Sequence, residues 1–106
     1  MKTILVLCVG NICRSPMAEA FLRRALPEKT IYSAGIGAMI GKPADQLAIR
    51  LMHEQGIDIT AHRAQQISSR LVMEADLILT MDTEQKKYVE STYPLSRGKE
   101  IGRAHV

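Results

Sequence analysis

The residues best suited to chemistry lie in one short segment near the start of the chain. Cys8 is followed after five residues by Arg14, and the residues between them read Val-Gly-Asn-Ile-Cys. A cysteine supplies a nucleophilic sulfur, and a guanidinium supplies a fork of donors that matches two oxygens of a phosphate group. Thiols close to a helix N-terminus or a guanidinium ionise more readily than free thiols. The pair therefore predicts attack by a thiolate on a bound phosphate ester, with a phosphocysteine intermediate.

The flanking sequence places this segment where proteins bind anions. Thr3 to Cys8 is an apolar, β-branched run typical of a strand buried on both faces, and Ser15-Pro16 predicts the N-cap and first residue of a helix. A loop between such a strand and helix can turn its amides towards an anion, and Gly10 allows a close approach. We therefore expect the phosphate to be bound by a continuous set of residues: Val9, Gly10, Asn11, Ile12, Cys13, Arg14 and Ser15.

Two side chains in the segment have predicted supporting roles. Asn11 tolerates the left-handed backbone that such a loop needs. The hydroxyl of Ser15 is expected to contact the sulfur of Cys8 in addition to capping the helix. The structural alternative is a cysteine that merely fills the core at the end of a strand. A bare Cys-x5-Arg pattern is weak, but the strand, the glycine, the Ser-Pro pair and the helix together favour the catalytic interpretation.

Strands and helices alternate along the rest of the chain. Further strands are expected at residues 30–34 and 75–81, and helices at residues 43–55, 67–72 and 82–92. This alternation predicts an α/β fold in three layers, with a parallel sheet between helices on both of its faces. The length of 106 residues predicts a single domain.

Composition limits the class of ligand. The net charge of +3 suits an anionic ligand but is too mild to indicate a nucleic acid, and no apolar run is long enough to insert in a membrane. A nucleotide-binding Walker loop is excluded because Gly-Lys-Ser/Thr is missing. His53, His62 and His105 form no zinc pattern with the cysteines, so we expect neither a metal nor a cofactor. We expect a cytoplasmic protein, in which the two cysteines serve chemistry instead of a structural disulfide.

The segment Cys-Val-Gly-Asn-Ile-Cys-Arg-Ser-Pro resembles the phosphate loop of the low-molecular-weight protein tyrosine phosphatases at every position. The resemblance covers residues 2 to about 99 and includes four further stretches: Ser33-Ala34-Gly35, Gly41-Lys42-Pro43-Ala44-Asp45, His62-Arg63-Ala64 and Asp76-Leu77-Ile78-Leu79-Thr80-Met81. The loop and residues 35–39 look most like bacterial members that act with tyrosine autokinases in capsule and exopolysaccharide export.

The resemblance implies a phosphotyrosine protein as substrate, such as a bacterial tyrosine autokinase, and a four-stranded parallel sheet. It implies that Cys8 is the nucleophile and that Arg14 holds the transition state. It also implies roles for residues around them: Asn11, Ser15, Ser33 and His62 as supports of the loop, Met39 as an apolar wall of the substrate pocket, and Cys13 as a redox partner that traps an oxidised Cys8 as a disulfide.

The chain departs from the family pattern after Lys99. The family's general acid is the Asp of an Asp-Pro motif, and this sequence contains no Asp-Pro. Asp82 follows a strand at the appropriate edge of the sheet, but capping a helix is its preferred role. We interpret residues 1–99 as an incomplete phosphatase domain that lacks the family's last strand and closing helix. Residues 100–106 are interpreted as a non-native tail, because one frame of a common sequencing adapter encodes them.

Two other functions stay open at this stage. One is a catalytically impaired module that binds phosphate, which the missing acid favours. The other is an arsenate reductase of the same fold, although no cysteine follows Cys13 to resolve its intermediate.

Overall fold

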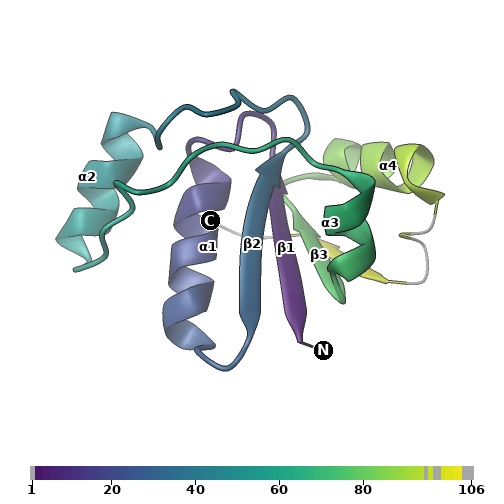
Figure 1. Cartoon of the computed structure of the whole chain (residues 1–106), viewed down its shortest axis with the longest axis horizontal. Helices are drawn as coiled ribbons and strands as arrows, with labels where there is room; N and C mark the ends of the chain where they lie inside the picture. The colour runs from purple at the N-terminus through teal and green to yellow at the C-terminus, as the bar shows by residue number, and fades with distance from the viewer. Residues whose placement is uncertain (1, 95, 97–98, 104–106) are drawn as a thin grey trace.

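Four strands and four helices make up the described part of this computed structural model (Figure 1). The structure describes residues 2–94, 96 and 99–103, and residues 100–103 by their backbone alone. The elements follow one another in this order: β1 (Thr3–Cys8), α1 (Arg14–Ala25), β2 (Thr30–Gly35), α2 (Gln46–Glu54), α3 (Ser69–Glu74), β3 (Leu77–Thr80), α4 (Thr83–Thr92) and β4 (Glu100–Arg103).

The strands form one parallel sheet in the order β2-β1-β3-β4. Strand β1 is therefore flanked on both sides, with Val6 paired to Ser33 of β2 and to Leu79 of β3. The last residue of β1, Cys8, pairs with Gly35 at the end of β2. Ligands of open parallel sheets bind at the carboxyl ends of the strands, and the register brings the loops after β1 and β2 together at that edge.

Helices cover both faces of the sheet (Figure 1). The side chains of Ile4 and Val6 pack in one cluster with α1, whereas those of Leu5 and Leu7 pack in another with α3 and α4. Helix α2 packs on α1, through a third cluster that includes Met52. The predicted α/β fold with helices on both faces of a parallel sheet is confirmed.

Aspartate side chains cap the N-termini of α2 and α4. Asp45 caps α2 by accepting a hydrogen bond of 3.0 Å from the amide of Leu47. Asp82 caps α4 by accepting one of 2.8 Å from the amide of Gln85, in agreement with its preferred role as a cap. Among the residues described, no helix has the length and apolar character needed to cross a membrane.

The expectation that the fourth strand is missing is wrong. The backbone of Glu100–Arg103 forms β4, which pairs in parallel with β3. The register runs from Leu77 opposite Glu100 to Thr80 opposite Arg103. The physical reason is that β3 presents a row of backbone donors and acceptors on its side away from β1, and an extended segment can satisfy them. The interpretation of residues 100–106 as a non-native tail stays a prediction, and residues 104–106 lie outside the described part.

Candidate active site

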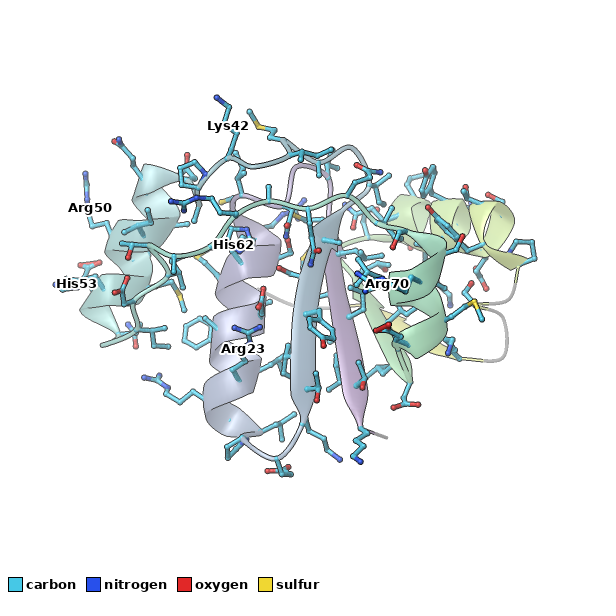
Figure 2. All side chains as sticks on the ribbon, viewed as in Figure 1. Arg23, Lys42, Arg50, His53, His62 and Arg70 are labelled. Carbon is cyan, nitrogen blue, oxygen red and sulfur yellow. The ribbon has the colours of Figure 1, made fainter. Side chains whose placement is uncertain are left out.

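The carbonyl groups of the phosphate loop, residues 8–14, accept hydrogen bonds from the surrounding protein. The carbonyl oxygens of residues 8, 9 and 10 accept hydrogen bonds of 2.9–3.0 Å from the amides of residues 36, 37 and 39, in the turn after β2. The carbonyl of Ile12 accepts one of 2.7 Å from the amide of Asp45. The carbonyl oxygen of Asn11 lies 2.7 Å from Nε2 of His62, and Figure 2 shows His62 near the N-terminal end of α1.

The outward carbonyls determine where the amides of the loop point. In a trans peptide unit the carbonyl and the following N–H point in opposite directions. Because the carbonyls of residues 8–12 face the surrounding protein, the amides of residues 9–13 face the interior of the loop. The first turn of α1 adds its unpaired amides at the same place. The loop is therefore a concave set of donors suited to a tetrahedral oxyanion.

The sulfur of Cys8 lies at the base of this concave surface. Cys8 ends β1 and is 5% exposed. Its Sγ accepts a hydrogen bond of 3.3 Å from the amide of Asn11 and lies 2.9 Å from the hydroxyl oxygen of Ser15. Both groups can direct a hydrogen towards the sulfur.

Ser15 is not the helix cap that the sequence predicted. Helix α1 already begins at Arg14, and Cys13 occupies the cap position without a side-chain hydrogen bond. The hydroxyl of Ser15 is instead completely buried between the sulfur of Cys8 and the amide nitrogen of Asn11, Nδ2, which lies 2.8 Å away. The expected N-cap is therefore wrong, because the hydroxyl is used by the loop.

Asn11 connects the loop to its surroundings. It is completely buried, and among the described residues other than glycine it alone has a positive φ, of 59°. Its Nδ2 donates to the hydroxyls of Ser15 and Ser33, the latter at 3.0 Å, and its Oδ1 accepts from the amide of Gln65 at 2.9 Å. The structure thus brings together the four predicted supports of the loop, since Asn11 contacts Ser15, Ser33 and His62.

The other predicted residues lie around the mouth of the loop. Arg14 is exposed at the first position of α1. Met39 is 49% exposed, and a Cβ added to Gly10 would lie 3.7 Å from its Cγ, so its side chain lies beside the loop. Such a half-exposed apolar side chain is available to pack against a substrate.

Cys13 is an exposed, free thiol, and Cys8 is free as well. Partial burial raises the pKa of the Cys13 thiol, and the nearby charges of Asp45 and Cys8 add to this effect while Arg14 opposes it. A raised pKa keeps a larger fraction of Cys13 protonated, which slows its attack on an oxidised sulfur. The redox role of Cys13 stays a prediction.

Sequence reasoning missed several residues that hold the site. Ser33 donates to the carboxylate of Glu19, which also forms an ion pair of 2.6 Å with Arg23 of the same helix. The side chain of Gln65 donates to the carbonyl of Ser33 at 2.9 Å. The i,i+4 spacing of Glu19 and Arg23 was visible in the sequence, but their link to Ser33 depends on the packing of α1 against β2.

Comparison with known proteins identifies the family. The family model described as low molecular weight phosphotyrosine protein phosphatase matches residues 3–101. The chain belongs to this family. It is 56% identical over 98 residues to the probable low molecular weight protein-tyrosine-phosphatase EpsP of Ralstonia nicotianae, a match that covers 92% of this chain and 68% of EpsP.

Solved structures of this phosphatase family have the same fold. The tyrosine phosphatase Wzb of Escherichia coli K30, in complex with sulphate, superposes with a TM-score of 0.90 at 42% identity and covers 95% of this chain and 71% of its own. Wzb of Vibrio vulnificus, in complex with benzylphosphonate, has a TM-score of 0.90 at 44% identity, with coverage of 95% and 72%. The ligands of both neighbours are tetrahedral oxyanions.

Proposed function

We propose that the chain hydrolyses phosphotyrosine in proteins through a phosphocysteine formed on Cys8. The observation that supports this most directly is the position of its sulfur, at the base of a loop whose carbonyls are bonded outwards to other parts of the protein. A phosphate bound by the inward amides would have its phosphorus above the sulfur, which is the arrangement that in-line attack requires.

The proposed reaction has two steps. The thiolate of Cys8 attacks phosphorus, the S–P bond forms and the bond to the tyrosine oxygen breaks. Arg14 turns towards the loop and donates to two of the phosphoryl oxygens, where charge accumulates in the transition state. Water then attacks the phosphocysteine, the S–P bond breaks, and inorganic phosphate leaves while the hydroxyl of Ser15 stabilises the departing thiolate.

Protonation of the leaving group is the step for which these 106 residues do not supply the Asp-Pro acid. The sequence has no Asp-Pro, and the carboxylate of Asp82 is used to cap α4. Without an acid the phenolate departs unprotonated, and general acid catalysis is typically worth about 10²- to 10⁴-fold in rate. We therefore expect para-nitrophenyl phosphate, whose leaving group is the more acidic, to be hydrolysed much faster than phosphotyrosine.

The decisive experiment measures para-nitrophenyl phosphate hydrolysis by the chain, by Cys8→Ser and by Arg14→Lys, together with phosphate binding by calorimetry. Turnover that disappears in Cys8→Ser and falls strongly in Arg14→Lys is expected. Phosphate binding without any turnover in the parent chain would instead support the catalytically impaired module.

We propose further that the substrate is a bacterial tyrosine autokinase acting in exopolysaccharide production in the cytoplasm. The support is the resemblance of the phosphate loop and of residues 35–39 to bacterial phosphatases of that kind. Incubating the chain with an autophosphorylated kinase of this class should remove its phosphotyrosine. An unchanged phosphotyrosine signal, under conditions where para-nitrophenyl phosphate is hydrolysed, would contradict this assignment of substrate.

A further inference from the structure

The connection between α2 and α3 passes the carboxyl end of β2 (Figure 1). We call residues 62–67 of this connection the strap, and two neighbouring glutamines lie on it. The strap is joined to the end of β2 by backbone hydrogen bonds, from the amide of Gly35 to the carbonyl of Gln65 at 2.8 Å and from the amide of Ile67 to the carbonyl of Gly35 at 2.9 Å. Gln65 and Gln66 are thereby held beside the loops that form the site.

The two side chains reach different parts of the site. Gln65 donates from Nε2 to the carbonyl of Ser33, while its backbone amide donates to Asn11. Gln66 donates from Nε2 to the carbonyl of Ile36 at 2.7 Å, and its Oε1 accepts from the amide of Ala38 at 2.8 Å. Gln65 therefore supports the phosphate loop, whereas both polar atoms of Gln66 hold the turn after β2.

The turn after β2 carries the apolar side chain at the mouth of the site. Met39 follows Ala38 directly, and its side chain lies beside Gly10 of the phosphate loop. The phosphate loop has anchors outside this turn, at Asp45, at His62 and through the buried side chain of Asn11. Gln66 forms hydrogen bonds to both ends of the segment from Ile36 to Ala38.

We propose that Gln66 is a specificity-positioning residue, which fixes Met39 as the wall against which the aromatic ring of the substrate packs. This inference rests on the proposed function, because it concerns the substrate pocket of the same site. Loss of the two hydrogen bonds frees the turn and moves the wall, which weakens ring packing. The phosphate subsite should change less than the wall, because Asp45, His62 and the buried side chain of Asn11 still hold the loop although the turn also bonds to the carbonyls of residues 8–10.

The test compares two ligands that differ by an aromatic ring, namely benzylphosphonate and inorganic phosphate. Their dissociation constants are measured by calorimetry for the parent chain, Gln66→Ala, the matched control Gln65→Ala and Met39→Ala. Net hydrogen-bond contributions predict that Gln66→Ala binds benzylphosphonate about three- to tenfold more weakly, with a smaller loss of affinity for phosphate. Gln65→Ala should not alter the preference for benzylphosphonate over phosphate.

A double variant tests whether Gln66 acts through Met39. Gln66→Ala combined with Met39→Ala should bind benzylphosphonate no more weakly than Met39→Ala alone, because residues that act as one unit are not additive. Gln66→Glu keeps the acceptor for the amide of Ala38 and loses the donor to the carbonyl of Ile36, so its affinity for benzylphosphonate should lie between those of the parent and Gln66→Ala. It replaces Gln66→Ala in the test if that variant fails to fold.

The outcomes separate this inference from the proposed function. If the parent chain prefers benzylphosphonate and Gln66→Ala keeps that preference, or loses affinity for both ligands equally, the inference is wrong and the proposed site stands. If the parent chain folds and binds neither ligand, the proposed function itself is contradicted.

Discussion

The two ends of strand β1 are held by the same kind of contact in very different surroundings. At the carboxyl end, the buried amide of Asn11 joins the phosphate loop to Ser15, Ser33 and the strap. At the amino end, the exposed carboxylate of Asp76 accepts hydrogen bonds of 2.9 Å from the amides of Lys2 and Thr3. Water can replace a lost partner at the amino end but is excluded at the carboxyl end.

This contrast shows where the molecule depends on single side chains. A buried polar group that loses its partner keeps its full desolvation cost, whereas an exposed one is rehydrated. Substitutions at the carboxyl end of β1 should therefore alter both stability and chemistry, and substitutions at the amino end should alter stability alone.

The largest effect is expected for Asn11→Asp, which keeps the shape of the side chain. The carboxylate cannot donate to Ser15 or Ser33, and it adds a buried negative charge beside an anion site. Uncompensated buried charges typically cost about 3–5 kcal/mol, so urea denaturation at neutral pH should show a large loss in the free energy of unfolding. Phosphate affinity should fall as well; a variant with the parent's stability and phosphate affinity would show that Asn11 does not organise the loop.

A smaller effect is expected for Gly35→Ala, at the end of β2. A Cβ at this position would lie 2.5 Å from the carbonyl oxygen of Val9 and 3.0 Å from Ala38. The backbone must move at both places, and such overpacking typically costs about 1–3 kcal/mol. Calorimetry should show weaker binding of phosphate, since Val9 belongs to the phosphate loop. Gly41→Ala is a useful comparison, because space is open there and its φ of 80° strains the backbone without a contact to the loop.

The smallest effect is expected for Asp76→Asn, and it should depend on pH. Hydrogen bonds from the amides of Thr3 and Lys2 hold the pKa of Asp76 below its ordinary value of 3.8. A depressed pKa in the folded state means that the carboxylate stabilises the fold above pH 3.8 and that this contribution is lost as the pH falls further. The difference in urea midpoint between parent and variant should therefore shrink towards acid pH, with phosphate binding at neutral pH unchanged. A difference that grows on acidification would contradict the assigned role of Asp76.

The sequence was sufficient to predict the α/β fold class and the loop between β1 and α1, because both are encoded by consecutive residues. The run Thr3–Cys8 is apolar at every position after Thr3, which only a strand buried on both faces explains well, and the phosphate loop follows it without interruption. The cap at Asp82 is local in the same sense, since its carboxylate accepts from an amide three residues further on.

The remaining features depend on contacts between distant segments. Gln65 is 54 residues from Asn11, and no periodicity or spacing links the two positions. The hydroxyl of Ser15 contacts the sulfur of Cys8 as predicted, but it does not cap α1, because the packing of Asn11 engages it within the loop. Strand β4 was missed because its pairing depends on the free side of β3 as well as on its own residues.

The outward direction of the loop carbonyls has a consequence for mutagenesis. If the ligand is bound mainly by backbone N–H groups, replacing Val9 or Ile12 by alanine removes none of the donors. An alanine scan would then assign little importance to positions that contact the phosphate directly. Amide chemical shifts of residues 9–13 during a phosphate titration would reveal those contacts, because they report on the peptide groups themselves.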